Sequence, residues 1–147
     1  MKFEYDTDAF TEDALEKLAE VSPILAEVLG NAQVANNQLR LDNGVGLEDK
    51  KMKAYSPEYA EQRQARGERI DVRNLVQTGR MRGAMALQGV EKTATGAIAT
   101  VGFSDARARM LAFYNQQRTP FFGVSGEDAT KLNEIGQAET KRLIEGE

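Results

Sequence analysis

Arginines on two short predicted helices are the side chains that this sequence singles out for chemistry. Arg80 and Arg82 lie in a single predicted helical turn, whose N-terminal N–H groups could help to bind an anion. Arg107, Arg109 and Arg118 form the basic face of a second predicted helix. Three interpretations remain open for this face: contact with acidic protein surfaces, ordinary surface salt bridges, and contact with nucleic acid.

The usual catalytic and metal-binding side chains are scarce. The 147 residues include no histidine, the commonest proton-transfer group. They also include no cysteine, which could supply a thiolate metal ligand. The sequence contains no Gly-x-Ser-x-Gly motif. Asp42, Glu48 and Asp49 could bind a cation weakly but do not complete a calcium loop, and Gly44 and Gly46 lack the Gly-Lys-Ser/Thr of a phosphate loop. We therefore expect no catalysis, no cofactor and no metal.

Size and composition predict one soluble domain over residues 1–147. A chain of this length buries roughly 70% of its unfolded surface, and 41% of its residues are hydrophobic. The net charge of −4 makes it a poor non-specific binder of phosphate backbones. The uncharged run Thr93–Ser104 is too short and glycine-rich to cross a bilayer, and the N-terminus has no apolar signal region. We expect the chain to stay in the cytoplasm.

Hydrophobic spacing predicts a long N-terminal helix over residues 8–36. Ser22-Pro23 either separates two helices or kinks one, and Gly30 weakens the end. Residues 37–53 are expected to be irregular.

Capping residues predict the later helices. Ser56-Pro57 begins a short polar helix, Glu58–Arg66, and Ser104-Asp105 begins another, Asp105–Gln117. Ser125 caps a C-terminal helix whose expected inward stripe is Leu132, Ile135, Ala138 and Leu143.

The clearest β signal is a hairpin formed by Met85–Thr93 and Gly96–Phe103. The second run is apolar on both faces, so we expect it to be central in a sheet or covered on both sides. Because a two-stranded hairpin is barely stable alone, further strands are expected from residues 37–53, 70–76 or 120–124, or from another chain. The predicted fold class is α+β, with a small antiparallel sheet flanked by helices.

Phe121 and Phe122 follow Pro120 in the most unusual peptide of the chain. In an extended backbone, adjacent side chains point in opposite directions. One phenylalanine can then enter the core, while the other needs a second apolar surface, such as an adjacent subunit. The alternative is that the last helix covers both.

Several peptides, in this order, carry a resemblance to a known family: MKAYSPEYA at residues 52–60, NLVQTGRM at 74–81, VGF at 101–103, AFYNQQ at 112–117 and RTPFFGVS at 118–125. The chain resembles the virion morphogenesis proteins of tailed bacteriophages, which are small neck, head–tail joining or tail-completion proteins. The likeness covers roughly residues 50–130, most of the chain.

The resemblance implies an α+β, non-enzymatic protein that forms a ring, most often six-fold, at the junction of capsid and tail. Such a ring joins the portal-side connector to the tail terminator or tail tube, and DNA passes through its lumen. On this interpretation, the virion is the final location, reached through the host cytoplasm. The candidate interface with subunits or neighbouring rings comprises Arg80, Arg107, Arg109, Arg118, Phe121 and Phe122.

Two rival functions remain. One is a cytosolic regulatory or nucleic-acid-binding module that uses Arg80, Arg82, Arg107 and Arg109. The other is a hydrolase that works without histidine.

Overall fold

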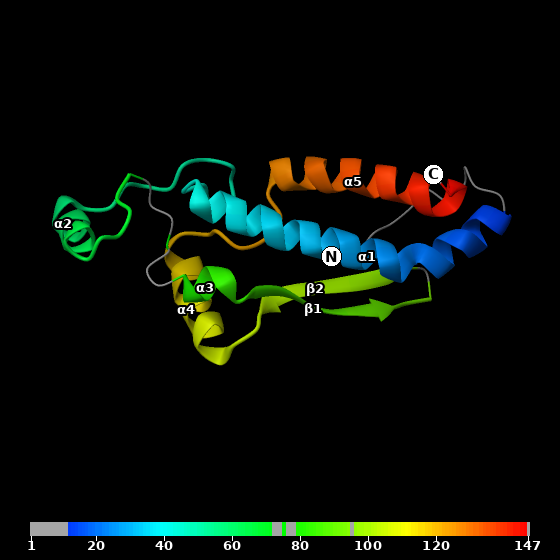
Figure 1. The fold of residues 1–147 in the computed structure, drawn as a ribbon, viewed down its shortest axis with the longest axis horizontal. Coiled ribbons are helices and arrows are strands. Elements are labelled where there is room, and N and C mark those ends of the chain that lie inside the picture. Colours follow the sequence, from blue (N-terminus) through cyan, green and yellow to red (C-terminus); the bar gives the residue numbers. More distant parts are fainter. Residues whose placement is uncertain (1–11, 72–74, 76–78, 95, 147) are drawn as a thin grey trace.

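Helix α1 lies at the centre of the fold, between α5 and a β-hairpin (Figure 1). The computed structural model describes residues 12–71, 75, 79–94 and 96–146. Its elements, in order, are α1 (Glu12–Asp42), α2 (Pro57–Ala65), α3 (Arg80–Gly83), β1 (Met85–Lys92), β2 (Ala97–Phe103), α4 (Ala106–Arg118) and α5 (Gly126–Glu145). This arrangement confirms the α+β class with long N-terminal and C-terminal helices.

Helix α1 is one helix and not two. Pro23 lies inside it, and the Ser22 hydroxyl donates a hydrogen bond of 2.5 Å to the Leu18 carbonyl one turn earlier. Proline removes a backbone donor and crowds the preceding turn, so it bends a helix that tertiary packing keeps intact. Figure 1 shows α1 changing direction in its N-terminal half, as the kinked alternative requires.

The predicted end of this helix at residue 36 is too early, because α1 continues to Asp42, and Gly30 lies inside the helix. Gly30 marks a close approach between elements. A Cβ atom there would lie 2.6 Å from Leu87 Cδ1 and 3.2 Å from the Cβ of Ala99, on the two strands of the hairpin. The glycine therefore lets α1 lie directly on the sheet, and residues 37–42, expected to be irregular, are helical.

The hairpin is confirmed. Strands β1 and β2 pair antiparallel from Met85↔Phe103 to Lys92↔Ala97, with a register shift between Leu87 and Gly89. In the described part of the chain the sheet has only these two strands, so β2 is not central. The strands expected from residues 37–53 and 120–124, and from the described part of 70–76, are absent, and residues 37–53 form only an isolated bridge between Val45 and Lys51. Residues 72–74 and 76 lie outside the described residues. Packing against α1 replaces the missing strands, because it covers the buried Ala97 and Ala99.

All three capped helix starts are confirmed. The side chains of Ser56, Asp105 and Ser125 accept hydrogen bonds from the first turns of α2, α4 and α5. The inward stripe of α5 was wrong in part, since Ile135 and Ala138 are exposed. Its buried residues follow an i, i+4, i+8 spacing instead: Asp128, Leu132 and Gly136.

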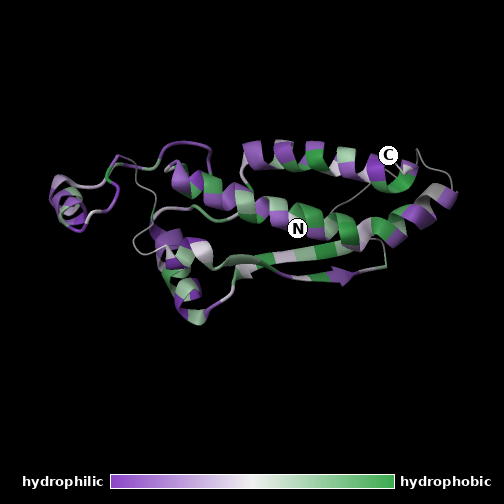
Figure 2. Ribbon diagram, viewed as in Figure 1, coloured by the Kyte–Doolittle hydropathy of each residue, from purple (hydrophilic) through white to green (hydrophobic). Residues whose placement is uncertain are grey.

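The largest core cluster lies where the C-terminal end of α1 meets α3, α4 and the hairpin. Its members include Leu41, Met81, Phe103, Ala112 and Phe121. Two smaller clusters join α1 to α5 and α1 to the hairpin. Figure 2 shows hydrophobic residues concentrated in the middle of α1 and along β2, whereas α2 is almost entirely hydrophilic.

Candidate functional site

Helix α2 projects from the rest of the molecule on two connecting segments (Figure 1). We call residues 53–71, which contain it, the arm. Between the arm and the α3–α4 end of the body lies a groove of about 1240 Å³. Its described lining comprises Lys53, Ala54, Tyr55, Ser56, Pro57, Tyr59, Arg63, Leu75, Gly79, Arg80, Met81, Arg82, Arg107, Leu111, Asn115 and Arg118.

The groove is basic. Of the predicted interface residues, it brings together Arg80, Arg107 and Arg118, whereas Arg109 lies outside its lining. No carboxylate is found among its described lining residues. Arg82 also lines the groove, so three of the four arginines in the nucleic-acid alternative gather here.

Several of these cations are already paired. Arg82 forms a bidentate ion pair with Asp42, with hydrogen bonds of 2.6 and 2.7 Å. The hydrogen bonding to Asp42 raises the pKa of Arg82. Arg80 Nε lies 3.5 Å from Asp105. Arg107 and Arg118 are exposed and form no ion pair with any residue that the structure describes. They are therefore the cations best placed to receive an external partner.

The arm is held by its own residues. Arg63 is only 2% exposed, its guanidinium lies 4.5 Å from the centre of the Tyr55 ring, and its Nη1 lies 3.1 Å from Glu68. Arg69 anchors the returning segment by donating to the Asp42 carbonyl at the end of α1, at 3.0 Å. Stacking and ion pairing thus replace an apolar core in this short polar helix.

Helix α4 presents large apolar side chains to solvent. Met110 is 53% exposed, Leu111 38%, Phe113 60% and Tyr114 58%. Only its small residues, Ala108 and Ala112, are buried. Clusters of exposed apolar side chains mark surfaces that a partner covers. The sequence predicted this apolar face, but only the structure shows that it points outward.

The structure places both phenylalanines of the candidate interface within the subunit. Phe121 is 1% exposed in the largest core cluster. Phe122 is partly buried and packs against the same cluster, with its ring 4.9 Å from that of Phe103. The covering elements are therefore α1, α3, α4 and the hairpin, and not the last helix. Gln116 holds the turn, since its Oε1 accepts from the backbone N–H groups of both phenylalanines at 3.0 Å.

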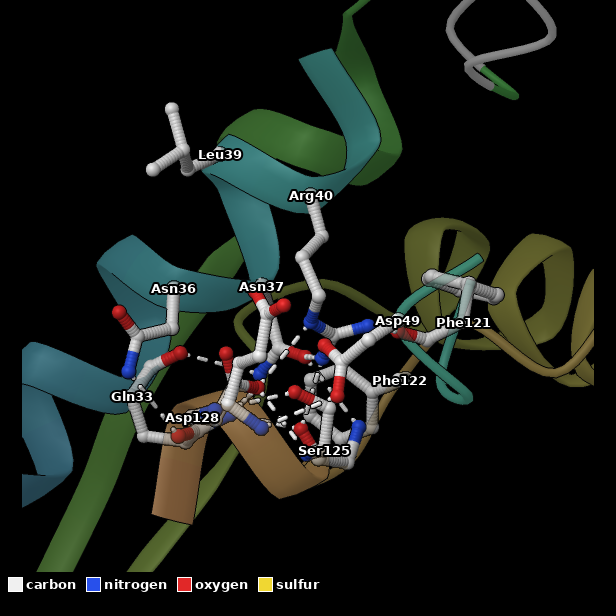
Figure 3. Close-up of polar contacts among 12 residues, drawn as sticks. Gln33, Asn36, Asn37, Leu39, Arg40, Asp49, Phe121, Phe122, Ser125 and Asp128 are labelled. Carbon is white, nitrogen blue, oxygen red and sulfur yellow. Dashed lines mark hydrogen bonds and ion pairs between the residues drawn. The ribbon is translucent and has the colours of Figure 1, made fainter. Parts of the chain in front are cut away.

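A buried polar network fixes the segment that follows them (Figure 3). Arg40 donates to the carbonyls of Phe121 and Gly123 and pairs with Asp128 at 3.0 Å. Asp128 completes the capping box of α5 with Ser125. Sequence reasoning recognised that cap but missed Arg40, because nothing in the local pattern shows that a charged residue of α1 faces inward.

Potential metal ligands do not cluster in the part of the chain that the structure describes. The described residues include no group of three His, Cys, Asp or Glu side chains that could hold a metal ion. Asp49, named as a weak cation ligand, accepts a hydrogen bond from the Glu127 N–H at the start of α5. Within the described residues, no helix combines the length and hydrophobicity needed to span a membrane.

Comparisons with protein-family models, with curated proteins and with solved structures found no match for this chain. Its function must therefore be inferred from the molecular surface and from the order of its sequence motifs.

Proposed function

We propose that this chain is a structural subunit of the head–tail junction of a tailed bacteriophage, a neck or tail-completion protein without a catalytic step. It forms a ring, with six copies as the expected number, between the portal-side connector and the tail terminator or tail tube. DNA passes through the lumen without specific binding, and the protein resides in the virion after assembly in the host cytoplasm.

The observation that carries this proposal is the apolar face of α4. Four large side chains exposed on one short helix, beside Arg107 and Arg118, have the composition of a protein interface. The projecting arm supports the same view, because a segment with few contacts to its own body is suited to contacts with a neighbour. The ordered peptides add the phage context.

The test is to locate the chain in particles. Purified virions should contain several copies per particle, placed by cryo-electron microscopy between capsid and tail. Phage in which the gene is deleted should accumulate separate heads and tails. Absence of the chain from purified virions would reject the proposal.

A second function, nucleic-acid binding, is favoured by the basic groove. Titration of duplex DNA with the protein at several salt concentrations decides between the two. A linear fall of the logarithm of the DNA affinity with the logarithm of the salt concentration would support binding by the groove arginines. Undetectable DNA binding at low salt would reject this second function.

A further inference from the structure

Helix α4 carries a ridge in which two cations flank apolar side chains. Arg107 and Arg118 lie about three helical turns apart, which is ~16 Å. Leu111 and Tyr114 follow Arg107 at i+4 and i+7, so they lie between the two arginines on the same side of the helix. All four side chains are exposed, and we call them the basic ridge.

The N-terminal half of α1 carries a ridge of the opposite charge. Glu16 and Glu27 are as many residues apart as the two arginines, which is ~16 Å along a straight helix, and the bend at Pro23 lies between them. Glu20 and Ile24 follow Glu16 at i+4 and i+8 on the same side of the helix. All four are exposed, and Ile24 is 47% exposed although it is apolar. We call these four residues the acidic ridge.

The two ridges cannot meet within one copy. Figure 1 shows α4 near the end of the molecule from which α2 projects, whereas α1 begins at the opposite end. The 31 residues of α1 span ~46 Å, and the acidic ridge occupies the half that lies far from α4. A contact between the ridges must therefore join two copies of the chain.

We propose that the basic ridge of one copy binds the acidic ridge of the next. Guanidinium–carboxylate pairs at both ends flank a central contact in which Leu111 and Tyr114 cover Ile24. Protein interfaces combine an apolar centre with a polar rim in this way. The inference rests on the proposed function, because it supplies the contact through which a ring of copies closes.

Two features favour a second copy of the chain, rather than a nucleic acid, as the partner of the basic ridge. The phosphate backbone of a nucleic acid matches the cations but offers nothing to the apolar side chains between them. The acidic ridge of this chain matches both, with the same spacing. Because the two ridges are different surfaces, the contact is head-to-tail, and such contacts repeat until they close as a ring or continue as a filament.

The test uses charge reversal at both ridges. The variants are Arg107→Glu/Arg118→Glu on the basic ridge and Glu16→Arg/Glu27→Arg on the acidic ridge. Sedimentation velocity over a concentration series measures self-association. Each variant should associate about tenfold or more weakly than the unmodified chain, because like charges then face each other.

Mixing the two variants tests the pairing directly. In an equal mixture, the reversed basic ridge of one variant can bind the reversed acidic ridge of the other, and their unaltered ridges can bind each other. The two variants should therefore alternate and associate as strongly as the unmodified chain. This recovery also shows that both variants are folded. The control, Lys131→Glu/Glu134→Arg, reverses two exposed charges on α5 outside both ridges and should associate normally.

Four results would overturn the proposal. They are an unmodified chain that stays monomeric over the whole series, double variants that associate normally, a mixture that does not recover, and salt-dependent binding of duplex DNA that is lost in Arg107→Glu/Arg118→Glu while association is unchanged.

The ridge contact and the virion role fail separately. If the chain forms rings that depend on the ridges but is absent from virions, only the virion role is rejected. A chain found in virions whose ridge variants still form rings rejects only the contact.

Discussion

At the scale of single residues, the pair formed by Arg40 and Asp128 joins the first helix of the chain to the last. Both side chains are buried. Arg40 contacts Phe121, Gly123 and Asp128 and also Asn37 on its own helix, while Asp128 accepts from Gln33 of α1 (Figure 3). Burying an ion pair costs desolvation free energy, so buried ion pairs persist only where further hydrogen bonds satisfy both partners. This network therefore fixes where α5 begins against α1.

Removing Asp128 should leave the Arg40 charge buried without its carboxylate. We expect Asp128→Ala to lower the free energy of unfolding by about 3 kcal/mol or more, measured by chemical denaturation followed by circular dichroism. Glu127→Ala, at the exposed neighbouring position, is the control and should change it by about 0.5 kcal/mol or less. Equal losses in both variants would mean that the network does not stabilise the fold.

The two phenylalanines differ in burial, so their removal should differ in cost. Phe121→Ala empties a site in the core and should cost about 3–5 kcal/mol of unfolding free energy. Phe122→Ala should cost less, because its ring is partly exposed, and Phe113→Ala on the exposed face of α4 should cost about 0.5 kcal/mol or less. Thermal denaturation orders the three variants. A large loss for Phe113→Ala would show that α4 is not oriented as described.

At the scale of the element, α4 depends on its N-terminal cap. The Asp105 carboxylate accepts a hydrogen bond of 2.7 Å from the Ala108 N–H. That bond, with a smaller contribution from Arg80, lowers the pKa of Asp105 below its ordinary value of 3.8. A lowered pKa in the folded state means that the ionised form contributes stability above pH 3.8, and that this contribution is lost as the pH falls through the lower value.

The prediction concerns the melting temperature of Asp105→Asn relative to the unmodified chain. Asparagine can still cap a helix but carries no charge, so the variant should melt lower at neutral pH. The difference should shrink and vanish as the pH falls below 3.8. Glu134→Gln, which changes an exposed carboxylate, is the control. A difference that stays constant with pH would contradict the assignment.

The arm is an element whose order depends on a few side chains. Helix α2 has nine residues, and isolated helices shorter than ~12–15 residues are marginal in water. We expect Arg63→Ala to speed hydrogen exchange of residues 57–65 while α1 and α5 stay protected, since the arm adds little to the body. Arg66→Ala, which alters a more exposed side chain of the same type, should leave the arm slow to exchange. Equal acceleration in the arm and the body would show that they unfold together.

At the scale of the whole molecule, charge is unevenly distributed. Basic side chains gather in the groove beside α3 and α4, and exposed carboxylates line the first half of α1 at the opposite end. A basic groove at one end and an acidic helix face at the other suit the proposed head-to-tail contact, whose on-rate should depend on ionic strength.

Self-association should therefore weaken as salt rises. Screening shortens the reach of exposed charges from ~10 Å at 0.1 M to ~3 Å at 1 M ionic strength. We expect the sedimentation coefficient at a fixed protein concentration to fall over this range. An unchanged or larger coefficient would mean that apolar contacts alone hold the copies together.

Local patterns predicted the elements well but not their partners. Capping residues and apolar spacing located α2, α4 and α5 and the hairpin, because these signals act within one or two turns. Gly30 was expected to weaken the end of the first helix, whereas it allows a close contact with Leu87 and Ala99 far along the chain. For the candidate site, the sequence selected Arg80, Arg107 and Arg118, and only the fold brings them to one groove.

Neighbouring residues specify the helices and strands of this chain, and place arginines and large apolar side chains together on α4, because helix and strand periods are local. The faces that become covered depend on how distant elements pack. Phe121 is buried in the cluster completed by distant elements, whereas Phe113 is exposed because α3 and β2 cover one side of α4 and leave the other open. Burial depends on the packing of distant elements, and that packing places the unsatisfied apolar surface where a partner can cover it.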